Sequence, residues 1–176
     1  MQPLKPEDIK YLIVHHTATP RDSTTFEAVK RYHTQEFGWE DIGYHFFING
    51  QGILNLGRPV NYVGSHCSAG SMNFKSLGIC LAGNFEVEKP SESQLKMLES
   101  ILRELMNKYK IPIDNLLGHC EVPGAKTLCP GKNLLEWLKN YREQQKRSSD
   151  IANILQAIQE TLARLQDLVS SLKSRL

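Results

Sequence analysis

The fold is decided by Tyr11-Leu12-Ile13-Val14-His15-His16-Thr17, a short run of β-branched and aromatic residues that ends in two histidines. Such a run predicts a buried β-strand. The strand would carry both histidines to its carboxyl end, the edge of a sheet where active sites often lie. Because adjacent strand residues point to opposite faces, we expect His16 to be a hydrogen-bonded support rather than a ligand.

Helical spacing replaces the strand pattern immediately downstream. Apolar and aromatic residues recur at this spacing between Ser23 and Gly38. Ser23 or Thr24 can cap the start of the helix, and Gly38 can end it. His33 shares this spacing, and we expect it to have a structural role or to support a site.

Three apolar runs predict further strands. Residues 44–48 and 53–56 flank Asn49-Gly50-Gln51-Gly52, which indicates a hairpin because Asn-Gly readily takes the positive φ angles of tight turns. The third run covers residues 76–82, with Cys80 at its centre as an expected packing residue. Together these runs predict a mixed sheet.

The segments around these strands complete the predicted fold. Residues 61–75 are rich in Gly, Ser and Asn and lack a period, which indicates a long surface loop of the kind that carries function. After Pro90 the leucine spacing predicts a long amphipathic helix with a weak Ser91/Gln94 capping box, and residues 134–142 are helical again. Strands interleaved with helices indicate an α/β domain, a mixed central β-sheet flanked by helices.

The C-terminal segment follows a different pattern. Its apolar residues alternate steps of four and three, the heptad repeat of a coiled coil: Ile151, Leu155, Ile158, Leu162, Leu165, Val169, Leu172 and Leu176. Leucine at a with isoleucine at d favours trimers or tetramers, and Ile154 and Leu168 at g widen the apolar face. We therefore predict a homo-oligomer through residues 151–176. The alternative is that this helix folds back on its own domain.

Composition limits the remaining classes. At 176 residues, 40% of them hydrophobic and 23% charged, the chain suits one compact domain, predicted over residues 1–143, with a heptad-patterned helix over 144–176. A net charge of +2 is too small to indicate nucleic acid. The polar N-terminus and the lack of long apolar runs predict a protein made in the cytoplasm without a signal peptide or a membrane partner. Four scattered cysteines do not indicate a disulfide framework.

The residues best suited to chemistry are His15-His16, His119 and Cys129. Imidazole and thiolate together suit zinc, and three protein ligands would leave a fourth position open for water. An open position distinguishes a catalytic zinc site from a structural one. The residues lie far apart along the chain, so their spacing alone does not identify a site.

Four motifs follow one another in the chain: Ile13-Val14-His15-His16-Thr17-Ala18; Gly38-Trp39 through Gly43-Tyr44-His45-Phe46; Ser76-Leu77-Gly78-Ile79-Cys80-Leu81-Ala82-Gly83-Asn84-Phe85; and Gly118-His119 with Cys129-Pro130-Gly131. In this order they resemble the motifs of type 2 N-acetylmuramoyl-L-alanine amidases, the family of phage lysins and peptidoglycan recognition proteins. The resemblance runs from about Tyr11 to about Trp137 and leaves out the heptad segment.

This resemblance implies roles for particular residues. His15, His119 and Cys129 correspond to the zinc ligands of the family, and Tyr44 to the tyrosine that assists the zinc-bound water. Tyr44 could instead be a strand aromatic packed on the sheet. A second variant of the family has a glutamate where this sequence has Cys80, which favours Tyr44 as the assisting residue.

One position departs from the phage pattern. Phage lysins have a lysine two residues before the thiolate ligand, where this sequence has Thr127, with Lys126 one residue further back. The recognition proteins often have a threonine there. Either Thr127 or Lys126 could therefore stabilise the oxyanion.

Substrate contacts are expected from Trp39 and from the loop over residues 61–75, because a sugar-peptide ligand needs an aromatic wall with converging polar groups. His66, Asn73 and Phe74 match loop positions that face the muramyl peptide in relatives. Asn73 could instead be a turn residue that satisfies its own backbone.

The resemblance implies Zn2+-dependent hydrolysis of the amide between N-acetylmuramic acid and L-alanine in bacterial peptidoglycan. The enzyme would be a lysin that reaches the wall after lysis or holin-type release, and an oligomer would gain avidity for one wall. One alternative is a recognition module that binds peptidoglycan without cutting it, which Cys129 argues against. A coiled-coil assembly protein with an inactive domain is the other, and the intact His15, Tyr44 and His119 argue against it.

Overall fold

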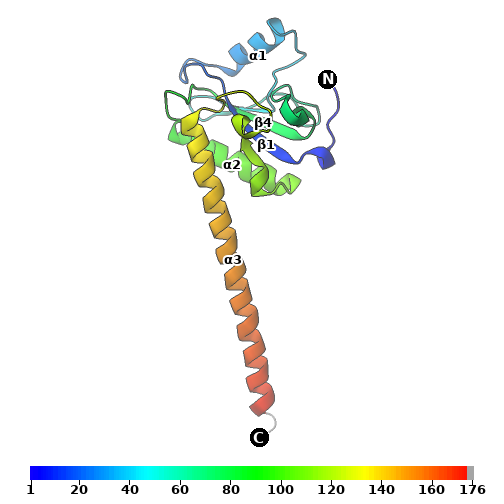
Figure 1. Ribbon diagram of the computed structural model, residues 1–176, viewed down its shortest axis with the longest axis vertical. Coiled ribbons are helices and arrows are strands. Elements are labelled where there is room, and N and C mark those ends of the chain that lie inside the picture. Colours follow the sequence, from blue (N-terminus) through cyan, green and yellow to red (C-terminus); the bar gives the residue numbers. More distant parts are fainter. Residues whose placement is uncertain (174–176) are drawn as a thin grey trace. The chain divides into compact units, whose positions relative to one another are not determined.

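The computed structural model of the protein describes residues 1–173 (Figure 1). Two compact units make up the chain, the first over Met1–Lys139 and the second beginning at Asn140. The boundary expected between residues 143 and 144 stays a prediction. Among the described residues, no helix is both long enough and apolar enough to cross a bilayer.

One five-stranded sheet organises the first unit. Its strands are β1 (Tyr11–His16), β2 (Phe46–Ile48), β3 (Leu54–Leu56), β4 (Ser76–Leu81) and β5 (Leu116–Gly118). They lie in the order β3-β2-β4-β1-β5, with β3 antiparallel to β2 and the other neighbours parallel. The predicted mixed sheet is confirmed, and β1 and β4 read as continuous apolar runs because both faces of the sheet are covered.

Helices α1 (Phe26–Gln35) and α2 (Glu92–Tyr109) lie on opposite faces of this sheet (Figure 1). Phe26 and Val29 of α1 pack against Phe47 of β2 and Cys80 of β4. Helix α2 begins with the predicted capping box, in which the Ser91 side chain accepts from the Gln94 N–H and the Gln94 side chain accepts from the Ser91 N–H. The predicted α/β class is therefore correct.

Two local predictions from the sequence, the capping residue of α1 and the positive φ angle of the hairpin, are wrong in detail. Thr25 caps α1, because its hydroxyl accepts from the Ala28 N–H, whereas Thr24 uses its hydroxyl to bond the Pro20 carbonyl. In the β2–β3 hairpin the positive φ falls on Gly52, at +81°, and not on the Asn-Gly pair. Asn49 contributes differently: its side-chain oxygen accepts from the backbone of Gln51 and Ile53.

Within residues 1–173, four 3-10 helices connect the larger elements: η1 (Pro6–Asp8), η2 (Ala69–Phe74), η3 (Ile113–Asn115) and η4 (His119–Glu121). The loop predicted over residues 61–75 therefore ends in η2 and is anchored, since Cys67 and Met72 are buried against Ile13 and Val122. This anchoring fixes the side chains that the loop presents to the carboxyl edge of the sheet.

Helix α3 (Lys132–Lys173) is continuous, so the helix expected over 134–142 and the heptad segment belong to one element. Eight apolar side chains of the segment are 50–59% exposed within the chain: Ile151, Ile154, Leu155, Ile158, Leu162, Leu165, Leu168 and Val169. The Leu172 side chain and Leu176 lie outside the described residues. The coiled coil itself remains a prediction.

Candidate functional site

Three potential metal ligands meet at the carboxyl edge of the sheet. His15 is the penultimate residue of strand β1, His119 follows strand β5, and Cys129 lies in the loop before α3. Because β1 and β5 are parallel neighbours, their carboxyl ends meet and bring together residues that are distant in sequence. One ligand atom from each of the three residues lies within 4.8 Å of the other two, and His15 Nδ1 is 3.6 Å from Cys129 Sγ.

Hydrogen bonds hold the Cys129 loop in place. The Cys129 N–H donates to the Thr127 hydroxyl at 3.0 Å, the Cys120 N–H donates to the Cys129 carbonyl at 2.7 Å, and Sγ accepts from the His16 N–H at 3.4 Å. The Thr127 hydroxyl is therefore held against the main chain of Cys129, whereas Lys126 is exposed.

Burial shifts the pKa values of His15, His119 and Cys129 away from their charged forms. Burial, followed by the nearby histidines, holds the pKa of His15 well below its usual value, and burial also lowers the pKa of His119. Both rings are therefore neutral, the form that binds metal. Burial raises the pKa of Cys129 to about 12, so a thiolate in this place needs a neighbouring positive charge. Two neutral imidazoles and one cysteine, which would bind as a thiolate, are a donor set that fits zinc.

Tyr44 lies beside this cluster, just before strand β2. Its ring centroid is 5.2 Å from that of His15 and 5.4 Å from that of His33. Burial, with smaller contributions from Cys80 and Cys129, raises the pKa of Tyr44 well above its usual value. The phenol is therefore neutral and can donate a hydrogen bond. Cys80 pairs with His15 in the sheet register, so this expected packing residue also borders the site.

A hollow of about 430 Å3 opens on the His119 side of the cluster. It gathers three of the four predicted substrate-contact residues, and its lining consists of Trp39, Ser65, His66, Cys67, Ser68, Asn73 and His119. The fourth, Phe74, is 49% exposed and is not part of this lining. The Asn73 side-chain oxygen accepts from the N–H groups of His66 and Cys67, so this side chain shapes the loop through residues six and seven positions earlier and not through its own backbone.

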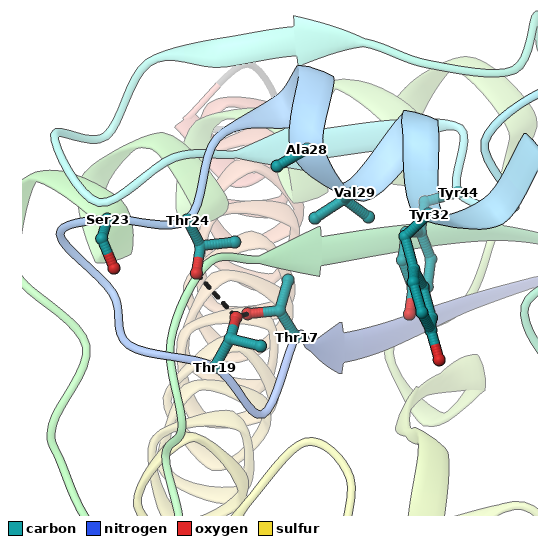
Figure 2. A pocket seen from close by; sticks show the side chains of 8 residues that line it. All are labelled: Thr17, Thr19, Ser23, Thr24, Ala28, Val29, Tyr32 and Tyr44. Carbon is teal, nitrogen blue, oxygen red and sulfur yellow. Dashed lines mark hydrogen bonds between the residues drawn. The ribbon is translucent and has the colours of Figure 1, made fainter. Parts of the chain in front are cut away.

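A second hollow, of about 420 Å3, opens beside Tyr44 (Figure 2). Its wall is a row of hydroxyls over an apolar floor from α1, and the lining consists of Thr17, Thr19, Ser23, Thr24, Ala28, Val29, Tyr32 and Tyr44. Thr19 donates to the Thr17 hydroxyl at 2.7 Å and lies 2.7 Å from the Thr24 hydroxyl. These bonds fix the segment between β1 and α1. One hollow therefore includes His119 of the three clustered residues, and the other includes Tyr44, which lies beside His15.

Three other histidines support the backbone around the cluster. His16 Nδ1 accepts from the Phe85 N–H, as expected of a support, and His33 Nδ1 accepts from the Gly43 N–H next to Tyr44. His45 Nδ1 accepts from the Gly78 N–H, and its Nε2 lies 3.0 Å from the Tyr62 carbonyl oxygen. Each ring therefore bonds to the main chain.

Arg58 supports the site although no motif in the sequence marks it. Its side chain is buried, and its guanidinium donates to the carbonyls of Ile42 at 3.0 Å, Val63 at 2.7 Å and Asp41 at 3.2 Å. These bonds tie the segment that leads into Tyr44 to the loop after β3. Only the loop conformation brings the three carbonyls together, so no local pattern marks this arginine.

Known proteins with similar sequences point to the same family as the motifs in the sequence. A family model described as N-acetylmuramoyl-L-alanine amidase matches residues 5–132. Peptidoglycan-recognition protein SC2 of Drosophila melanogaster is 31% identical over 140 residues, which cover 76% of this chain and 74% of that protein.

Two solved structures share the fold. One is titled endolysine N-acetylmuramoyl-L-alanine amidase LysCS from Clostridium intestinale URNW; it is 36% identical with a TM-score of 0.67, covering 80% of this chain and 88% of that one. The other is peptidoglycan recognition protein-LE in complex with tracheal cytotoxin, a monomeric diaminopimelic acid-type peptidoglycan. It is 30% identical with a TM-score of 0.68, covering 78% of this chain and 82% of that one. The resemblance seen in the sequence is confirmed, and the chain belongs to the N-acetylmuramoyl-L-alanine amidase family, Amidase_2.

Proposed function

We propose that this chain is a zinc-dependent amidase that hydrolyses the amide between N-acetylmuramic acid and L-alanine in bacterial peptidoglycan. The observation that carries the proposal is the convergence of His15, His119 and Cys129 beside a hollow that His119 lines, in a chain of the amidase family. A zinc ion held by these three residues would lower the pKa of water from 15.7 toward about 7 and polarise the amide carbonyl.

The chain's own residues supply orientation and hydrogen bonds. Tyr44 is a neutral phenol, so it would orient the attacking water or donate to the oxyanion, and it would not act as a base. The Thr127 hydroxyl oxygen accepts from the Cys129 N–H, and its hydrogen can still be donated to an oxyanion. The exposed Lys126 is the other candidate for this role.

The muramyl peptide would lie across the cluster with its scissile amide beside the ligands. Trp39, His66 and Asn73 line the hollow next to His119, and Phe74 lies close by in sequence at the end of η2. Support for this ligand class comes from the related recognition protein that was solved with a peptidoglycan fragment. The lysin role, with release by lysis or a holin, is part of the proposal and is supported by the structure titled endolysine.

Mass spectrometry of a purified muramyl tripeptide incubated with the protein tests the reaction. We expect release of free tripeptide and intact muramic acid, loss of this activity when a chelator removes zinc, and recovery when zinc is added back, because the ligand set supplies the activated water. Intact substrate in every tube, despite measurable binding, would instead indicate a recognition module.

We also propose that residues 151–176 assemble copies of this chain into a trimer or tetramer. The eight exposed apolar side chains of this segment all lie at a, d or g positions of the heptad repeat. The neighbouring e positions hold Ala152, Gln159, Gln166 and Lys173, so identical helices would meet with like charges at one e position near the end of the segment. Arg164, Lys173 and Arg175 are nearly balanced by Glu160 and Asp167, so the segment lacks the strong positive charge of a membrane-binding helix.

A pair of matched variants tests this assembly. We expect the wild type to have a mass three or four times 20.0 kDa in light scattering, and the double variant Ile158→Glu/Leu162→Glu to be monomeric, because two charges would enter the apolar seam. Ala157→Glu/Ala163→Glu adds the same charge outside the seam and should remain assembled. Equal masses for the two variants would contradict the proposal, and undiminished pelleting of the monomer with cell walls would contradict a gain in avidity.

A further inference from the structure

Both ring nitrogens of His15 are engaged. Nδ1 faces Cys129 Sγ at 3.6 Å, and Nε2 lies 3.0 Å from His66 Nδ1. If Nδ1 is the atom that faces the metal, the single proton of a neutral imidazole must lie on Nε2. His15 then donates this proton in a hydrogen bond to His66 Nδ1.

The second nitrogen of His66 continues the same chain of polar groups. With Nδ1 accepting, the ring proton of His66 lies on Nε2, which is 3.5 Å from the Ser76 hydroxyl oxygen. Ser76 in turn donates to the Met72 carbonyl in η2 at 2.6 Å. His15, His66 and Ser76 are all buried, so water competes little for these bonds.

Two glycines leave the space that the His66 ring occupies. A Cβ atom at Gly78 would lie 2.5 Å from His66 Cγ, and a Cβ atom at Gly64 would lie 2.5 Å from His66 Cδ2. The His66 main chain is also fixed, because its N–H donates to the Asn73 side chain at 2.9 Å. The position of the imidazole is therefore built into both the strand and the loop.

We propose that His66 is a positioning residue that orients His15, so that Nδ1 of His15 is its metal-binding atom. The proposal rests on the zinc site proposed above and assigns His66 a role beyond the substrate contact expected from the sequence. A metal-bound histidine whose other nitrogen is hydrogen-bonded keeps its tautomer and ring orientation, which strengthens metal binding. The edge of the His66 ring that lines the hollow can still meet a ligand.

The variants His66→Leu and His66→Asn separate hydrogen bonding from packing. The two side chains branch at the same carbon and have similar size, but the asparagine oxygen can accept a bond close to where Nδ1 stands. We expect His66→Leu to raise the zinc dissociation constant by about 10- to 100-fold in competition with a chromophoric chelator. His66→Asn should stay within about threefold of the wild type, a small change on the same scale.

His45→Leu is the matched control, because His45 is also a buried histidine but bonds to the main chain instead of to a ligand residue. Its zinc affinity should stay within about threefold of the wild type. Equal affinities for His66→Leu and His66→Asn, or an equal loss in His45→Leu, would overturn the positioning role. Failure of the wild type to bind zinc would overturn the zinc site, and this proposal with it.

Nitrogen NMR of the zinc-loaded wild type keeps the proposal testable even if His66→Leu does not fold. We expect the ring proton of His15 on Nε2 and the ring proton of His66 on Nε2. A proton on Nδ1 of either ring would overturn the proposal.

Discussion

Replacing Cys129 with serine is expected to lower the rate of muramyl amide hydrolysis by at least about a thousandfold, which corresponds to about 4 kcal/mol of transition-state stabilisation. A serine hydroxyl does not ionise as a thiol does, so the zinc site would lose its anionic ligand. The measurement is the release of stem peptide from muramyl tripeptide, with the zinc content of the dialysed protein determined alongside.

Cys120→Ser is the matched control for this change. Cys120 lies beside the same loop, and its N–H bonds the Cys129 carbonyl, but its thiol is not one of the three clustered donors. We expect this variant to keep its zinc and to remain within about twofold of wild-type activity, as is usual for a change outside the site. Retention of both zinc and activity by Cys129→Ser would exclude the proposed ligand set.

Replacing Arg58 with methionine is expected to lower the free energy of unfolding by about 3 kcal/mol or more. The change leaves the carbonyls of Asp41, Ile42 and Val63 without the guanidinium that bonds all three. Each carbonyl left unbonded in a buried place costs about 1 to 3 kcal/mol, and part of this is recovered if water enters. Urea unfolding of the zinc-free protein measures the effect.

An exposed arginine provides the comparison. Arg103 pairs with Glu99 one turn earlier in α2, and its side chain is 70% exposed. We expect Arg103→Met to change the free energy of unfolding by no more than about 0.5 kcal/mol. Similar losses in the two variants would mean that the three carbonyls are bonded equally well without Arg58.

The sequence predicted the elements that depend on local pattern. The apolar run before His15 became β1, and Ser91 with Gln94 became a capping box, because both signals involve residues close in the chain. The start of α1 was misplaced because Thr24 and Thr25 are adjacent cap residues, and only the bond from Thr24 to the Pro20 carbonyl decides between them.

The candidate site likewise contains residues that the motifs indicate and contacts that only the folded chain reveals. The resemblance assigned His15, His119 and Cys129 as a set, and the structure brings them together through two parallel strands. Neither Arg58 nor the bond from His15 to His66 could be predicted, because both depend on side-chain directions across segments distant in sequence. Periodicity describes which face a residue occupies, and it does not describe which atom meets which partner.

The distance along the chain between His15 and Cys129 also determines how late in synthesis the proposed metal-binding residues can come together. The two residues are 114 positions apart, and a ribosome adding about 5 to 20 residues per second needs roughly 6 to 23 seconds to cover that interval. Throughout that time the nascent chain has the first ligand without the last, so a prematurely terminated product cannot assemble the donor set. With the proposed zinc site, zinc content per chain would therefore report the fraction of chains that extend past Cys129 and have folded.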